Sequence, residues 1–196
     1  MDAAAPQGSN VYVLDPLARV LDPLVSQARE ALQQQARAIS QVGTRLDERF
    51  TRAVRMLHGL EGHVVVTGLG KSGHIGRKIA ATLASTGTPS FFVHSAEALH
   101  GDLGMVTERD VVILISYSGE TREVVQLLPF LQERGIRTIA LAGALDSTLG
   151  RSVDVALDVS VEREICPNDL CRSPRTAVAH RVVAAGERQG QRAQRR

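Results

Sequence analysis

The stretch "VVVTGLGKSGHIGRK" at residues 64–78 joins a β-branched run to a glycine-rich turn and then to a helical pattern. A strand that passes through such a turn into a helix is typical of a parallel α/β sheet. Gly68, Gly70 and Gly73 match the spacing G-x-G-x-x-G. Backbone amides in such a turn can approach an anion, and a helix N-terminus favours negative charge. The stretch therefore predicts a phosphate site and leaves open whose phosphate it holds.

Short apolar runs alternate with helical patterns along the rest of the chain. We expect strands at residues 63–68, 89–94, 110–118, 137–143 and 155–161, helices at 73–87 and 120–135, and a short helix at 147–153. Strands this apolar are covered on both faces, which is typical of a parallel sheet. The predicted fold class is α/β: a doubly wound three-layer sandwich around a five-stranded parallel sheet.

Helical spacing also dominates the chain before this sheet, from Pro23 to about residue 60. Asp15-Pro16 and Asp22-Pro23 each place a capping acid before a proline at a predicted first helical position. Gly43 and Thr44 predict a break between two helices. Pro129 lies inside a helical pattern, where we expect a kink.

Composition narrows the class of protein. A chain of 196 residues with 43% hydrophobic residues is long enough for one α/β domain with a real core. No apolar run reaches the ~18 residues that a membrane helix needs, and the start lacks a signal-peptide pattern. The spacing of Cys166 and Cys171 is only weak evidence for a zinc-binding site, because no second pair of ligands accompanies them. We expect a cytoplasmic protein with reduced thiols.

Ligands of open parallel sheets lie beyond the carboxyl ends of the strands. The first end lacks a full dinucleotide signature, because the second strand ends in His94 where an acid would hold the ribose. The P-loop pattern fails too, since it needs glycine where Val65 stands. Lys71 adds a cation beside the glycine turn, although a tight turn with an exposed lysine is the alternative interpretation.

The other strand ends carry further polar candidates. In "SYSGET", the hydroxyls of Ser116, Ser118 and Thr121 suit a phosphate monoester, with capping of a helix by Ser118 as the alternative. His94 and His100 follow the second strand and could act as acid, base or metal ligand, or be ordinary loop histidines.

Together the segments "GLGKSGHIGRKIAATLASTGTPSFFVHSAEALHGDLGM", "VVILISYSGET" and "ICPN" resemble the sugar isomerase (SIS) domain of bacterial D-arabinose 5-phosphate isomerases, from about residue 15 to about 170. The resemblance implies a cytoplasmic homotetramer that interconverts D-ribulose 5-phosphate and D-arabinose 5-phosphate for lipopolysaccharide (Kdo) synthesis, with no cofactor, nucleic acid or membrane partner. It implies Lys71, Glu123 and Glu164 as catalytic residues. It implies substrate contacts at Gly70, Ser72, Gly87, Thr88, His94, His100, Ser116, Ser118 and Thr121, and an inhibitory zinc ion at His94.

The resemblance predicts four regions: a disordered N-terminus at residues 1–14, helices packing on the core at 15–60, the SIS domain at 61–170 and an atypical tail at 171–196, with no CBS pair. The tail carries seven arginines and one acid, and it lacks the helix and histidine that the family places there. We interpret it as an out-of-frame ending that impairs the enzyme, with a basic tail for nucleic acid or anionic lipid as the competing interpretation. A non-catalytic sugar-phosphate sensor is the alternative function.

Overall fold

The computed structural model describes residues 16–162 and residue 183, with side chains for residues 23–162 and 183. The predictions for residues 1–14, for Glu164, for both cysteines and for nearly all of the tail therefore lie outside the described residues. The chain divides into two units, Met1–Gln34 and Gln35–Arg196, and the division falls inside the first helix.

All five predicted strands are present, each shorter than its apolar run. The elements follow in the order α1 (Pro16–Thr44), α2 (Glu48–His58), β1 (Val64–Gly68), α3 (Gly70–Ser85), β2 (Ser90–His94), α4 (Ser95–Leu99), the 3-10 helix η1 (Asp102–Met105), β3 (Val111–Ile115), α5 (Arg122–Val125), α6 (Leu128–Glu133), β4 (Arg137–Ala142), α7 (Thr148–Ser152) and β5 (Val155–Asp158).

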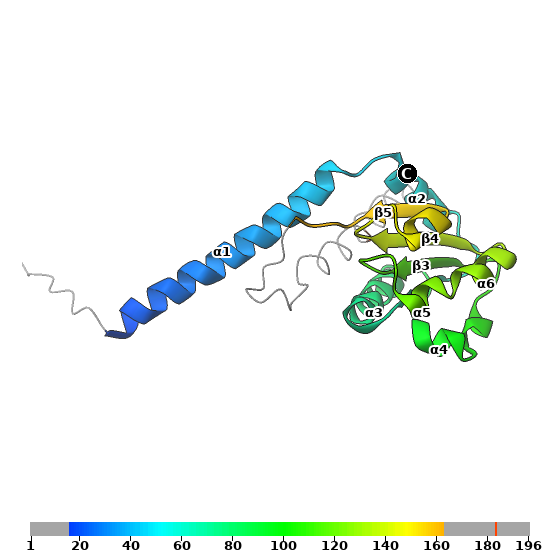
Figure 1. The fold of residues 1–196 in the computed structure, drawn as a ribbon, viewed down its shortest axis with the longest axis horizontal. Coiled ribbons are helices and arrows are strands. Elements are labelled where there is room, and N and C mark those ends of the chain that lie inside the picture. The colour runs from blue at the N-terminus through cyan, green and yellow to red at the C-terminus, as the bar shows by residue number, and fades with distance from the viewer. Residues whose placement is uncertain (1–15, 163–182, 184–196) are drawn as a thin grey trace, which may run out of the picture. The chain divides into compact units, whose positions relative to one another are not determined.

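The strands form one five-stranded sheet in the order β2-β1-β3-β4-β5, and every neighbouring pair is parallel (Figure 1). The register aligns Gly68 at the end of β1 with His94 on β2 and with Ile115 on β3. The predicted parallel sheet is confirmed. The carboxyl ends of β1, β2 and β3 therefore meet at one edge.

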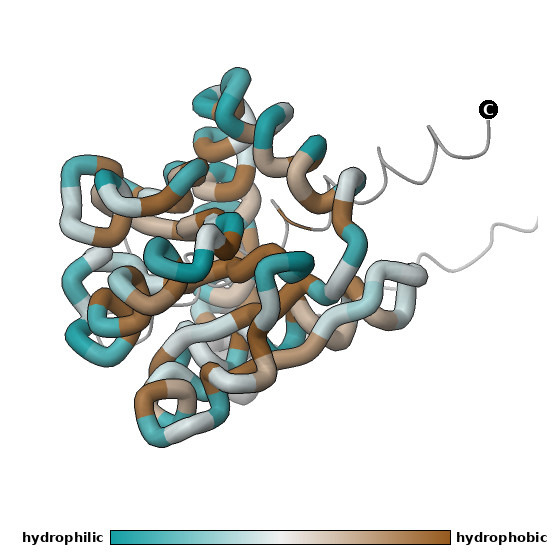
Figure 2. Tube along the Cα trace, turned by 90° about the vertical axis from the view of Figure 1, so that its right-hand side faces the viewer, coloured by the Kyte–Doolittle hydropathy of each residue, from teal (hydrophilic) through white to brown (hydrophobic). Residues whose placement is uncertain are grey.

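Alternate residues of each strand enter two separate apolar clusters, one on each face of the sheet. Val66 and Ile113 pack with Ile79 of α3 and with residues of α2 on one face. Val65 and Leu114 pack with residues of α4, α5, α6 and α7 on the other. Figure 2 shows the hydrophobic residues gathered in the central strands and the hydrophilic ones on outer turns. The predicted three-layer sandwich is confirmed.

The predicted helix start at Pro16, the break at Gly43 and Thr44 and the interruption near Pro129 agree with the structure, whereas the helix predicted over 73–87 runs from Gly70 to Ser85. α1 begins at Pro16 and ends at Thr44, and the helical run around Pro129 splits into α5 and α6 because proline has no N–H to give the preceding turn. The prediction of a helix start at Pro23 is wrong, since α1 runs through it. That proline removes one hydrogen bond, while the helical spacing on both sides continues.

Two carboxylates, the buried Asp110 and the exposed Asp154, join neighbouring strands at their amino ends. Oδ1 of Asp110 accepts a hydrogen bond from the backbone N–H of His63 at 2.6 Å, and Oδ2 accepts from the N–H and the hydroxyl of Thr107 at 2.7 and 2.9 Å. Burial raises the pKa of Asp110, but these hydrogen bonds outweigh it and hold the pKa below its ordinary value. Asp154 likewise accepts from the N–H and hydroxyl of Thr138.

We expect Asp110→Asn to lower the free energy of unfolding by about 2–3 kcal/mol at pH 7, because buried donors lose a charged acceptor. The folded pKa lies below the ordinary value of 3.8. The Asp110 carboxylate therefore contributes its full stabilisation of the fold when the pH lies above the ordinary pKa of 3.8. This stabilisation is lost as the pH falls through the folded pKa. Urea unfolding at pH 7 and pH 3 measures this, with Glu108→Gln, an exposed carboxylate in the same turn, as control. Equal losses in both variants would contradict the assignment.

An ion pair holds the connection between α1 and α2 against the end of β5. Arg45 donates from Nε to Oδ2 of Asp158 at 3.0 Å and from its terminal nitrogen to the carbonyl and hydroxyl oxygens of Ser160. These residues are more than 110 positions apart in the sequence. The sequence could not predict this pair. No local sequence pattern relates an arginine between two helices to an aspartate at the end of a distant strand.

Candidate functional site

The strand order reverses between β1 and β3, the point at which sheets of this kind form a crevice. The chain leaves β1 toward β2 on one side and returns to β3 on the other, so the connections after β1 and β3 diverge. Ligands of such sheets bind in the crevice beyond this point, where the strand order reverses. The glycine turn at Gly68 and the loop from Ser116 to Thr121 therefore bound the candidate site.

The N-terminus of α3 forms one wall of this crevice. Leu69 has extended backbone, and the 16-residue helix begins at Gly70, which is left-handed with φ +55°. Among the described residues, no side chain caps this helix start and no acid lies in its first turn. Its first N–H groups therefore offer hydrogen bonds and a partial positive charge to an anion. Lys71, exposed in the same turn, adds a full positive charge.

Two glycines bring α3 unusually close to the sheet. A Cβ at Gly73 would lie 3.0 Å from the carbonyl oxygen of Gly68, and one at Gly76 would lie 2.8 Å from the ring of Phe92. The guanidinium carbon of Arg77 lies 4.4 Å from the centre of that ring. The glycine spacing that resembles a dinucleotide fingerprint thus serves close helix–strand packing.

The loop after β3 forms the opposite wall, and its hydroxyls hold it in shape. The buried Oγ of Ser116 lies 2.7 Å from Oγ1 of Thr121 and accepts from the N–H of Gly119 at 3.1 Å. Oγ of Ser118 accepts from the N–H of Glu120 at 3.2 Å. Capping of the helix by Ser118 is wrong, because α5 begins at Arg122 with Thr121 before it. The hydroxyls organise a tight turn beside the crevice.

The two glutamates next to this loop have different surroundings. Oε1 of Glu120 accepts from the N–H of Thr148 at the start of α7, at 2.7 Å. That hydrogen bond lowers the pKa of Glu120. Glu123 is half-buried on α5, and its carboxylate forms no hydrogen bond or ion pair with the described residues. Glu120 is therefore a structural cap, whereas Glu123 is available for chemistry.

The two histidines follow β2, which lies on the opposite side of β1 from β3. His94 ends β2 opposite Gly68, and its Nδ1 atom is buried with no hydrogen-bond partner in the described part of the chain. His100 is exposed at the C-terminal end of α4. Within residues 23–162 and 183, no three His, Cys, Asp or Glu side chains gather as a metal site. An inhibitory zinc ion at His94 stays a prediction.

Gly87 and Thr88 lie away from this cluster. They follow α3 and precede β2, and the next carbonyl, that of Pro89, accepts from the N–H of Val64 at the start of β1 at 2.8 Å. This is the amino edge of the sheet, opposite the crevice. The structure brings Gly70, Lys71, Ser72, His94, Ser116, Ser118, Thr121 and Glu123 to the carboxyl edge. It does not bring Gly87 and Thr88 there, and their role stays a prediction.

Tyr117 joins the loop after β3 to two other strand ends, and sequence reasoning missed it. Its carbonyl accepts from the N–H of Gly143 at 2.8 Å, and a Cβ at Gly143 would lie 2.6 Å from its ring. Its phenol oxygen accepts from the N–H of Val161 at 3.4 Å. An aromatic residue between two serines was the only available signal.

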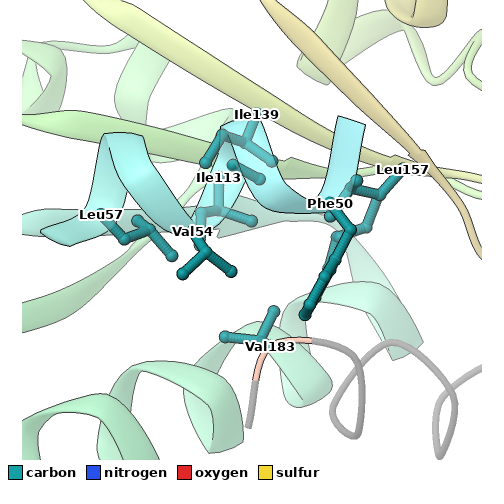
Figure 3. Close-up of a pocket in the computed structure, with 9 residues that line it drawn as sticks. Phe50, Val54, Leu57, Ile113, Ile139, Leu157 and Val183 are labelled. Carbon is teal, nitrogen blue, oxygen red and sulfur yellow. The ribbon is translucent and has the colours of Figure 1, made fainter. Parts of the chain in front are cut away.

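A separate hollow under α2 is apolar (Figure 3). Hydrophobic residues line it: Phe50, Ala53, Val54, Leu57, Ile113, Ile139, Leu141, Leu157 and Val183. Its volume of ≈ 20 Å³ has room for about one water molecule. It is a packing gap and does not suit a polar ligand.

A doubly wound sheet with a helix N-terminus and a hydroxyl loop at its strand-order reversal defines a class of phosphate-binding α/β domains. The chain belongs to the SIS domain family, whose model matches residues 60–179. The match extends past position 170, where the sequence pattern predicted the resemblance to end. In the described part of the chain, no helix has both the length and the hydropathy to cross a membrane.

Curated relatives are arabinose 5-phosphate isomerases. GutQ of Salmonella typhimurium is 50% identical over 155 residues, covering 79% of this chain and 48% of that protein. KpsF of Escherichia coli O6:H1 is 44% identical over 172 residues, covering 87% of this chain and 53% of that protein. The chain therefore spans about half the length of these relatives. The solved structure of E. coli CFT073 c3406 in complex with A5P superposes with a TM-score of 0.84 at 38% identity, covering 89% and 93% of the two chains.

Proposed function

We propose that this chain is an aldose–ketose isomerase that interconverts D-ribulose 5-phosphate and D-arabinose 5-phosphate. The observation that carries the proposal is the reversal of strand order between β1 and β3, where the uncapped start of α3 with Lys71 follows β1, and the hydroxyl loop with Glu123 follows β3. The names of the curated relatives and the ligand of the superposed structure support the choice of substrate.

In this proposal the N–H groups of α3 and the hydroxyls of Ser116 and Ser118 hold the phosphate group, because amides and hydroxyls supply hydrogen bonds to its oxygens. Gly70 and Ser72 bring the backbone close to it. The phosphate fixes one end of the sugar, so that the other end reaches the groups that exchange protons.

Aldose–ketose exchange moves a proton between adjacent carbons through an enediolate. Glu123 acts as the base that removes and returns this proton. Lys71 stabilises the negative charge that develops on the oxygen of the enediolate. Glu164, outside the described residues, is the second proposed acid–base group. His94 and His100 contact the sugar from the side of β2.

The broader setting follows from the same resemblance. We place the reaction in the cytoplasm, in a homotetramer, as a supply of arabinose 5-phosphate for lipopolysaccharide synthesis, with no metal requirement. Size-exclusion chromatography with light scattering tests the tetramer, and assays with and without EDTA test the metal requirement. A monomer, or activity abolished by EDTA and restored by a metal, would contradict these parts.

The direct test follows conversion of D-ribulose 5-phosphate by the purified chain, with product identified by chromatography. Conversion to D-arabinose 5-phosphate supports the isomerase. A folded chain that binds arabinose 5-phosphate but converts nothing would instead support the sugar-phosphate sensor. A chain that neither converts nor binds would refute both functions.

A further inference from the structure

Two helices share one face of the sheet, and the middle strands lie between them. On this face α3 packs on β1 and β2, whereas α2 makes its main contact with β5. The strands β3 and β4 lie between these two contacts. Their side chains on this face, those of Ile113, Ile139 and Leu141, are nevertheless at most 2% exposed. A parallel sheet is stable only when both faces are covered, so the cover over β3 and β4 needs an explanation.

Val183 from the tail supplies part of this cover. It is 7% exposed, has helical backbone and belongs to the same apolar cluster as Ile113 and Ile139. Together with residues of α2, β3, β4 and β5 it lines the apolar hollow described above. Figure 3 shows Phe50 and Val54 pointing from α2 toward Val183. A residue far beyond the last strand is therefore part of the core.

The sequence around Val183 suits a buried position. Residues 176–186 read "TAVAHRVVAAG", with seven alanines or valines and no acid. Six of the seven arginines of the tail lie outside this segment. The SIS family model, which matches residues 60–179, already includes its beginning. The segment therefore has the composition of a packed element, in contrast to the arginine-rich sequence on either side of it.

We propose that residues 176–186 form an apolar closure of the SIS domain, which docks through Val183 on β3 and β4 beside α2. This role differs from both interpretations of the tail made from the sequence, the out-of-frame ending and the arm for nucleic acid or anionic lipid. The proposal is independent of the proposed function, because the closure lies on a face of the sheet and the candidate site lies at its carboxyl edge.

Substitutions at Val183 in the full chain test the closure, with thermal unfolding followed by circular dichroism. Val183→Asp is expected to lower the Tm by about 5 °C or more, because a carboxylate would be buried among apolar groups. Val183→Ile is expected to keep or raise the Tm, because the added methyl group can enter the hollow of ≈ 20 Å³. The matched control is Val25→Asp on α1, where the valine is 53% exposed, and it should shift the Tm by less than about 2 °C.

Equal Tm shifts in Val183→Asp and Val25→Asp would overturn the closure. A Tm that is insensitive to Val183→Asp but rises with protein concentration would assign the cover to a second copy of the chain, which also overturns it. A loss in Val183→Ile as large as that in Val183→Asp would show that the site does not select apolar groups, with the same consequence. If Val183→Asp does not fold, Val183→Ala decides the question: a lowered Tm supports the closure, and an unchanged Tm overturns it.

Discussion

Glu123→Gln is expected to lower kcat for conversion of D-ribulose 5-phosphate by about 10²–10⁴-fold, because an amide cannot remove the proton that the reaction moves. The carboxylate is half-buried on α5 beside the crevice and has no hydrogen-bond partner among the described residues. The amide has nearly the same shape, so we expect the stability and the affinity for arabinose 5-phosphate to change little. Steady-state kinetics and calorimetry measure both effects.

The matched control is Glu133→Gln, the same chemical change on an exposed residue at the end of α6. It should leave kcat within twofold of the wild type. A Glu123→Gln enzyme that retains a third or more of the wild-type kcat would exclude this carboxylate as the base. A loss confined to KM would instead assign Glu123 to substrate binding.

Gly119→Ala is expected to lower the free energy of unfolding by about 2–5 kcal/mol and to abolish measurable phosphate binding. Gly119 has φ +67°, a conformation that costs an L residue about 1–2 kcal/mol. An added Cβ would lie 1.9 Å from Oγ of Ser147 and 2.4 Å from its Cβ, which adds overpacking. Either the loop or the start of α7 must then move, and the turn held by Ser116 is lost.

Gly43→Ala provides the comparison, because a Cβ there meets nothing within 4 Å and its backbone is helical. It should raise stability slightly, since alanine favours a helix over glycine. Urea unfolding and calorimetry with inorganic phosphate measure both variants. Gly119→Ala with wild-type stability and phosphate affinity would show that the turn does not shape the site.

The sequence could predict the parts of this fold that depend on local pattern. Apolar runs located all five strands, and Pro129 located the division of α5 from α6, because each effect acts within one turn or strand. Pro23 misled the prediction, since a proline signals a helix start only when the helical pattern does not precede it. The contact between Arg45 and Asp158 could not be found, because it depends on the packed fold.

The candidate site was predictable to a similar degree. Residues at the carboxyl ends of strands, such as Lys71 and Ser116, could be selected because parallel strands end at a common edge. The difference between Glu120 and Glu123 could not, because it depends on the N–H of Thr148, which arrives from a distant helix.

The close contact of α3 with the sheet has a kinetic consequence. Gly73, Gly76 and the stacked pair of Arg77 and Phe92 leave the helix no room to shift toward β2. If the proposed phosphate site is correct, the N–H groups at the start of α3 are therefore already in place before the phosphate arrives, and little ordering entropy is lost on binding. Phosphate esters should then associate at similar speeds and differ mainly in residence time.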